Sequence, residues 1–119
     1  MALKVLVCGS RDWDDAAAIT NRLGLIPFVR PDVPVVIHGA APGADTLAAK
    51  AARGFGMRVQ AFPADWKTHG KAAGPIRNLQ MLDQEPHVVL AFQRNGSRGT
   101  QHTIDEARKR GIKVEVFDA

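Results

Sequence analysis

The sequence has no tyrosine, a single cysteine and no long apolar run. Because Cys8 is alone, an internal disulfide and a metal site built from several cysteines are excluded. No stretch approaches the roughly twenty apolar residues that a membrane-spanning helix needs. The opening MALKVLVCG is too short and too soon polar for a signal peptide. We therefore expect a cytoplasmic protein without a membrane partner, in which Cys8 is a small buried residue.

Clustered charge is also missing, since the basic residues form no run of five or six. The 119 residues carry a formal net charge of +4, and the pI is about 9.7. This balance permits an anionic partner without choosing between a nucleotide and a nucleic acid. The length suits one domain spanning residues 1–119, with no linker or low-complexity tract. The four histidines match no spacing of known metal ligands, so we expect neither a metal nor a cofactor.

What the sequence does contain is an alternation of strand-like and helix-like segments. Five apolar runs rich in β-branched residues lie at 3–8, 34–38, 58–62, 87–92 and 113–117. Four segments with helical spacing separate them, whereas 63–73 is expected to be a polar loop. Gly56 and Gly111 are expected to end two of these helices in the left-handed conformation. This alternation predicts an α/β fold, a Rossmann-like three-layer sandwich with about four helices. Its five-stranded, mostly parallel sheet is expected to have the order 3-2-1-4-5.

The tripeptide Gly-Ser-Arg follows both the first and the fourth predicted strand, as Gly9, Ser10, Arg11 and as Gly96, Ser97, Arg98. In the predicted order these two turns flank the switch point of the sheet, where ligands of open α/β sheets bind. Glycine allows close approach of the backbone, and the N–H groups that open a helix attract anions. Arg11 and Arg98 can each offer a charged fork to phosphate. We therefore predict a phosphate site between the two turns.

The segment HGAAPGAD (38–45) ends the second strand at the same edge. Gly39 and Gly43 permit a tight turn, and Asp45 falls in the first helical turn, where a carboxylate is favoured by the helix dipole. We interpret Asp45 first as a helix-start residue and second as a ribose or catalytic contact.

The segment HGKAAGPIRN (69–78) opens the third predicted helix. Pro75 suits a first helical turn, and an arginine at position 77 then opposes the helix dipole. A bound anion would remove that unfavourable interaction. Arg77, next to Asn78, is therefore the arginine that we most expect to be functional.

Both tryptophans follow an aspartate in a loop, in RDW (11–13) and in ADW (64–66). Trp13 and Trp66 can stack on a nucleobase. They can equally cover the core beneath a long loop. The sequence leaves both alternatives open.

Together these segments resemble the SLOG superfamily, and within it the short YspA/YpsA-related branch of single-domain bacterial and phage proteins. The matching motifs are GSRDW, HGAAPGAD, PADW, GKAAGPIRNLQM and GSRGT. The resemblance implies a domain that binds a nucleotide or a nucleotide-derived ligand at the edge described above. Because members of the superfamily are often dimers, it also implies a homo-oligomer.

Sister LOG enzymes are phosphoribohydrolases whose motif reads Pro-Gly-Gly-x-Gly-Thr-x-x-Glu, with an arginine on the preceding helix. Arg77 matches that arginine, and the turn is matched by Gly96, Ser97, Arg98, Gly99 and Thr100. The position of the glutamate is Thr103, so the carboxylate that would assist departure of the base is missing. Hydrolysis would need a replacement from Asp45, Asp65 or Glu106.

Three functions follow from these patterns. The leading hypothesis is a sensor or regulatory module that binds one class of nucleotide, with phosphate on the 96–100 turn and no turnover. The alternative is an N-glycosidase acting on a nucleoside phosphate, with Arg77, Asp45 and Glu106 as candidate catalytic residues. A third possibility, single-stranded nucleic acid binding, rests on the pI and on the SLOG-type domains that act in DNA uptake.

Overall fold

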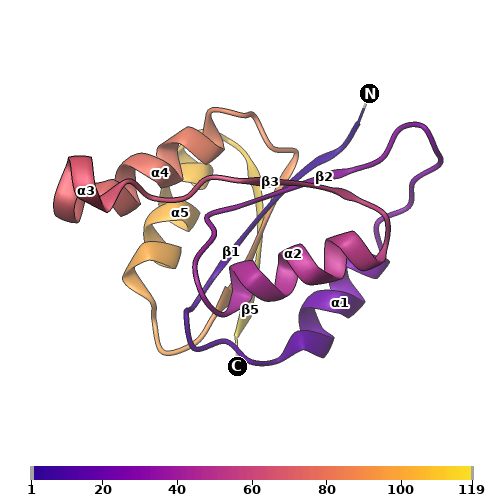
Figure 1. The fold of residues 1–119 in the computed structure, drawn as a ribbon, viewed down its shortest axis with the longest axis horizontal. Coiled ribbons are helices and arrows are strands. Elements are labelled where there is room, and N and C mark those ends of the chain that lie inside the picture. Colours follow the sequence, from indigo (N-terminus) through magenta and orange to yellow (C-terminus); the bar gives the residue numbers. More distant parts are fainter. Residues whose placement is uncertain (1, 119) are drawn as a thin grey trace.

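The sheet of the computed structural model, which describes residues 2–118, has five parallel strands in the order β3-β2-β1-β4-β5 (Figure 1). The strands are β1 (Lys4–Gly9), β2 (Val35–His38), β3 (Arg58–Ala61), β4 (Val88–Gln93) and β5 (Lys113–Asp118). All four pairings are parallel. The predicted fold class and strand order are therefore confirmed.

Helices cover both faces of this sheet. The four longer ones are α1 (Ala16–Gly24), α2 (Ala44–Gly54), α4 (Ala73–Leu82) and α5 (Arg98–Lys109). In Figure 1, α1 and α2 lie on one face, and α4 and α5 lie on the other. No helix among residues 2–118 is both long and apolar enough to cross a membrane.

The segment 63–73 differs from its prediction as a loop. It contains the single-turn helix α3 (Trp66–His69) and the 3-10 turn η1 (Gly70–Ala72), which lead directly into α4. The Asp65 side chain caps α3 by accepting the Thr68 N–H at 3.1 Å. The polar composition of this segment is typical of a loop, but it also includes this N-cap residue. The short arm formed by α3 and η1 extends from the body of the molecule at the left of Figure 1.

The hydrophobic core is divided into two parts by the sheet, because successive side chains of a strand point to opposite faces. On β1, Val5 and Val7 belong to the cluster beneath α1 and α2. Leu6 and Cys8 belong to the cluster beneath α4 and α5. Cys8 is 6% exposed, as predicted for a small buried residue.

Two glycines end helices as predicted. Gly56 follows α2 with φ of +78°, and Gly111 follows α5 with φ of +72°. Both values lie in the left-handed region that glycine adopts without steric cost. Each therefore turns the chain from a helix into the next strand.

Candidate functional site

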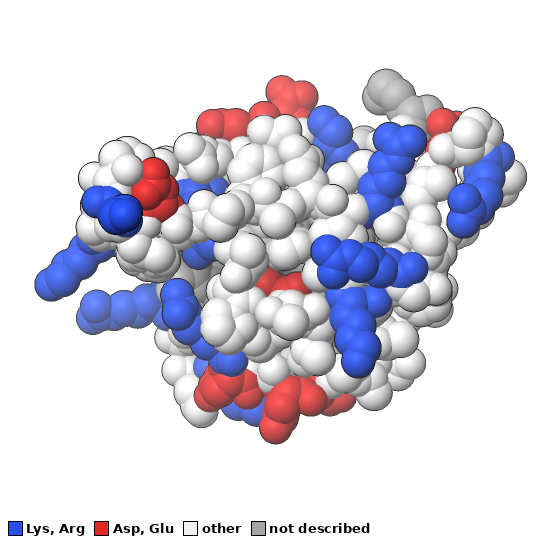
Figure 2. Space-filling view, in the orientation of Figure 1, with Lys and Arg blue, Asp and Glu red and all other residues white. Residues whose placement is uncertain are grey.

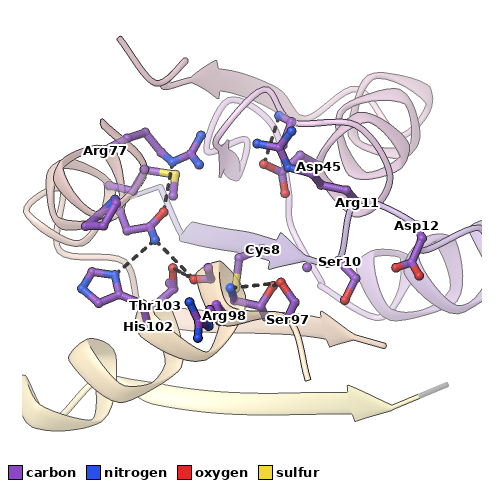
Figure 3. Close-up of a pocket in the computed structure, with 18 of the residues that line it drawn as sticks. Cys8, Ser10, Arg11, Asp12, Asp45, Arg77, Ser97, Arg98, His102 and Thr103 are labelled. Atoms are coloured by element: carbon purple, nitrogen blue, oxygen red, sulfur yellow. Dashed lines mark hydrogen bonds between the residues drawn. The ribbon is translucent and has the colours of Figure 1, made fainter. Parts of the chain in front are cut away.

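A cleft of about 760 Å³ opens at the carboxyl edge of the sheet (Figure 3). Its walls come from the ends of β1 and β4, the loop after β2, the α3 arm, α4 and the first turns of α5. The sequence-predicted residues that line it are Gly9, Ser10, Arg11, Asp45, Trp66, Arg77, Asn78, Ser97, Arg98, Gly99 and Thr100. The cleft thus lies at the predicted switch point of the sheet.

The turn after β4 presents open hydrogen-bond donors to the cleft. Ser97 is the N-cap of α5, and its hydroxyl oxygen accepts the Thr100 hydroxyl at 3.1 Å and the Thr100 N–H at 3.5 Å. The backbone N–H groups of Arg98 and Gly99 donate to no described residue, as expected at a helix start. The Arg98 side chain is exposed and forms no hydrogen bond or ion pair within residues 2–118.

Gly99 leaves this turn unobstructed. A Cβ atom built at Gly99 would meet no atom within 4 Å, so the glycine faces open space. Its carbonyl oxygen accepts the Asn78 amide at 3.3 Å and the Thr103 hydroxyl at 3.2 Å. The first turn of α5 is therefore held in place by the hydrogen bonds to the Gly99 carbonyl, while the Cα of Gly99 faces the cleft.

The turn after β1 is closed by comparison. The Ser10 hydroxyl donates to the Arg94 carbonyl oxygen at 3.0 Å and accepts the Arg94 N–H at 2.7 Å. A Cβ atom at Gly9 would lie 2.4 Å from the Phe92 carbonyl oxygen and from the Ala44 Cβ. Both residues thus hold neighbouring loops together. Arg11 is exposed and makes no hydrogen bond or ion pair with a described residue.

The prediction that Arg77 lies in the first turn of its helix is wrong. Because α4 begins at Ala73, Arg77 lies in the second helical turn rather than the first. Its guanidinium donates to the carbonyl oxygens of Gly39 and Phe62, at the ends of β2 and β3. Burial lowers the pKa of Arg77. This arginine joins α4 to the edge of the sheet while it lines the cleft.

Asn78 connects the same helix to α5. Its buried side chain accepts the Arg77 Nε–H at 3.0 Å and donates to the Gly99 carbonyl. Its amide nitrogen also lies 3.2 Å from the His102 Nδ1. Arg77 and Asn78 therefore form a polar bridge across the floor of the cleft.

Asp45 does lie in the first turn of α2, but its carboxylate does not cap that helix. It turns back to the loop after β2, where Oδ2 accepts the Gly39 N–H at 2.9 Å and the Ala41 N–H at 3.4 Å. The residue is 5% exposed. Burial raises the pKa of Asp45 to about 6, against the opposing effect of these N–H groups and of Arg77 and Arg11.

Of the two tryptophans, Trp13 belongs to the core. Its side chain is 3% exposed, its Nε1–H donates to the Asp15 carbonyl at 2.9 Å, and its ring packs edge-on against Phe92. The ring is covered, so the base-stacking alternative for Trp13 is wrong. Trp66 is 49% exposed and lies in the wall of the cleft.

Two of the carboxylates considered for catalysis lie away from the cleft. Glu106 forms an ion pair with Lys109 at 3.3 Å, and Asp65 caps α3. Neither lines the cleft. Among the three candidates, only Asp45 is placed where it can reach a ligand.

Three predicted glycines support the cleft without lining it. Gly39 makes room for Arg77, because a Cβ atom there would lie 2.4 Å from the guanidinium. Gly43 has φ of +78° and packs against the backbone carbonyls of Ser10 and Arg11. Gly96 has φ of +62° and makes the bend before α5.

Two lining cations were missed in the sequence analysis. Lys71 lies in η1, a turn that had been read as loop. Arg94 follows β4 directly, and its place at the carboxyl end of a central strand was the available signal. Arg94 is already committed to an ion pair with Asp14 at 2.9 Å and stacks over Trp13.

Within the described part of the chain, unpaired cations lie on one side of the cleft. Figure 2 shows Lys and Arg side chains over much of this face of the molecule, and some of them project from the end at which α3 lies. Lys71 and Arg98 are exposed residues of the cleft wall. Because their charges are not paired with carboxylates of residues 2–118, this side of the cleft attracts anions.

Comparisons with known proteins agree with this architecture. The sequence model of the YspA, cpYpsA-related SLOG family matches residues 3–69. Gene 61 protein of Mycobacterium phage D29 is 40% identical, over 96% of this chain and 95% of its own length. DNA processing protein A (DprA) from Streptococcus pneumoniae has a similar fold, with a TM-score of 0.59 and 18% identity over 98% of this chain. The chain spans 59% of the length of that DprA structure.

Proposed function

Because this chain belongs to the YspA, cpYpsA-related SLOG family, we propose that its cleft binds a nucleotide or a nucleotide-derived ligand through a phosphate group. The observation that carries the proposal is the open first turn of α5. There the N–H groups of Arg98 and Gly99 have no partner among the described residues, and nothing fills the space before Gly99. Such a turn binds phosphate without rearrangement.

The remaining parts of a nucleotide have complementary surfaces nearby. The guanidinium groups of Arg11 and Arg98 have no partner among the described residues and can pair with the charge of the phosphate. Trp66 offers an exposed ring for a base. Since Thr103 occupies the position at which LOG enzymes carry glutamate, we propose binding without turnover, as in a sensor or regulatory module.

Hydrolysis is the second candidate, and Asp45 is the observation that favours it. A carboxyl group in the cleft with a pKa of about 6 can donate a proton near neutral pH. In an N-glycosidase, such a group would protonate the departing base. Release of free base from a bound nucleotide distinguishes this function from binding alone.

The proposal is tested by the variant Gly99→Ala. The added methyl group enters the space where phosphate would lie, but it meets no protein atom. We therefore expect the unliganded variant to unfold at a slightly higher temperature, since alanine stabilises a helix by about 0.5 kcal/mol relative to glycine. We expect its affinity for the nucleotide to fall at least about tenfold, which is about 1.4 kcal/mol.

The matched control is Gly54→Ala in the last turn of α2, where an added Cβ also meets nothing within 4 Å. Gly54 does not line the cleft. Thermal shift is measured for both variants and the wild type with nucleoside monophosphates, cyclic nucleotides, NAD and ADP-ribose, and released base is checked by chromatography. A ligand at a hundred times its Kd stabilises by about 2.7 kcal/mol. If Gly99→Ala binds as well as Gly54→Ala, the phosphate is not at this turn. If no compound shifts the wild type, the small-nucleotide function is wrong.

A further inference from the structure

One oxygen of the Asp45 carboxylate has no partner. Oδ2 accepts two backbone N–H groups, but within residues 2–118 Oδ1 accepts none and no cation lies within ion-pairing distance. Within residues 2–118, His38 Nε2 is the only fully buried side-chain nitrogen or oxygen without a partner. Oδ1 is therefore reachable from outside, and because Asp45 lines the cleft, it is reachable from the cleft (Figure 3).

This oxygen restricts what can lie next to it. A carboxylate accepts hydrogen bonds and repels a phosphate. A ligand group facing Asp45 must therefore be a hydrogen-bond donor, an O–H or an N–H. The two ends of the cleft thus demand different chemistry, an anion at the first turn of α5 and a donor at Asp45.

The topology sets the separation of these two ends. Asp45 follows β2 and the open turn follows β4, with β1 between them. Neighbouring strands lie about 4.8 Å apart, so the two ends are about two strand spacings from each other. In a nucleoside 5′-phosphate the sugar adjoins the phosphate, and its hydroxyl groups lie on the far side of the ring. With a phosphate at the β4 turn, there is room for the sugar over the end of β1, and its hydroxyls can then face Asp45.

We propose that Asp45 accepts a hydrogen bond from a ribose hydroxyl group, so that the cleft selects ribonucleotides over deoxyribonucleotides. The inference rests on the proposed phosphate site. It also gives the buried carboxylate a role that its place at a helix start does not explain, because the side chain turns away from its own helix.

The experiment measures the Kd of the four ribonucleoside 5′-monophosphates and of their 2′-deoxy and 3′-deoxy counterparts for the wild type and for Asp45→Asn. A hydrogen bond to a charged group corresponds to roughly 10- to 100-fold in affinity. We expect the wild type to favour a ribonucleotide over one of its deoxy forms by this factor. In Asp45→Asn the ratio of the deoxyribonucleotide Kd to the ribonucleotide Kd should fall to within about threefold of unity, which is about 0.65 kcal/mol.

Each outcome separates the inference from the proposed function. If wild type binds ribo and deoxy forms equally, the assignment of Asp45 is overturned while the nucleotide function stands. If Asp45→Asn keeps the wild-type ratio, the discrimination arises elsewhere and the assignment is again overturned. If no monophosphate binds, the proposed function fails for this class, and the inference fails with it.

A pH series in the wild type keeps the test independent of the variant. The charged groups and thiol that affect Asp45 are Arg11, Arg77 and Cys8. Cys8 stays protonated over this range because burial raises its pKa. Titration of the phosphate affects both ligands equally, so it cancels in the ratio of their affinities. We expect the ratio to decrease as pH falls from 7.5 to 5, and a constant ratio would contradict the inference.

Discussion

The two Gly-Ser-Arg turns have the same sequence and opposite environments. At the end of β1, Gly9 lies close to the Phe92 carbonyl, and Ser10 forms two hydrogen bonds with the backbone of Arg94. After β4, Gly96 and Gly99 face open space, and Ser97 caps α5. One turn holds the two loops together, while the other leaves its backbone N–H groups free.

The difference follows from what each turn meets. The β1 turn lies between the loops after β2 and β4, since β1 is the central strand of the sheet. Glycine is needed there because a side chain would have no space. Serine is needed because its hydroxyl group pairs with the backbone N–H and carbonyl groups of Arg94. The β4 turn borders the cleft, so glycine there leaves room for a ligand. The same tripeptide thus supports the site at one place and forms it at the other.

The sharpest test of this comparison is alanine at the two glycines. In Gly9→Ala the new methyl would lie 2.4 Å from a backbone oxygen, so we expect a loss of about 3 kcal/mol or more in the free energy of unfolding. Gly96→Ala meets no atom but adopts φ of +62°, which costs about 1 kcal/mol. Urea denaturation measures both values. Equal losses would show that the β1 turn is not tightly packed.

A second test uses the pH dependence of the free energy of unfolding to probe Asp45, which lies across the cleft from the β4 turn. The pKa of Asp45 is raised from 3.8 to about 6 in the folded protein, so the folded state binds the proton more tightly than the unfolded state does. Stability from this group is therefore lost as pH rises from about 4 to 6, by about 3 kcal/mol.

The measurement is the difference in unfolding free energy between wild type and Asp45→Asn across that range. We expect the variant to gain stability relative to wild type with rising pH. Carboxyl groups whose pKa is lowered, such as Glu115 beside Arg22, change stability in the opposite sense and cancel in this difference. A difference that is independent of pH would mean that Asp45 is well solvated.

The effects expected at the two serines are smaller than those expected for Gly9→Ala and for the titration of Asp45. Ser10→Ala leaves the N–H and carbonyl of Arg94 without their partner, a loss of about 2 kcal/mol. Ser97→Ala removes a helix cap, a loss of about 1 kcal/mol. Thermal unfolding of both variants measures the order, and a larger loss for Ser97→Ala would reverse the roles assigned to the two turns.

Much of the fold was predictable, because strand runs and helical spacing are local signals. The strand order, the helix-ending glycines Gly56 and Gly111 and the burial of Cys8 were all predicted correctly. The α3 arm was missed because a four-residue helix is too short to show a helical periodicity in the sequence. The interpretation of Arg77 failed because it depended on a helix start that was placed later in the sequence than Ala73, where α4 begins.

The sequence by itself determined the architecture and the edge at which the cleft lies, because periodicity and β–α alternation act over short distances. Tertiary structure decided which of the similar residues face the cleft. Trp13 became part of the core and Trp66 part of the wall, and Asp45 kept one carboxylate oxygen open while Glu106 lies elsewhere. The reason is physical: exposure and free hydrogen-bonding capacity depend on neighbours that are distant in sequence, and only folding brings those neighbours into place.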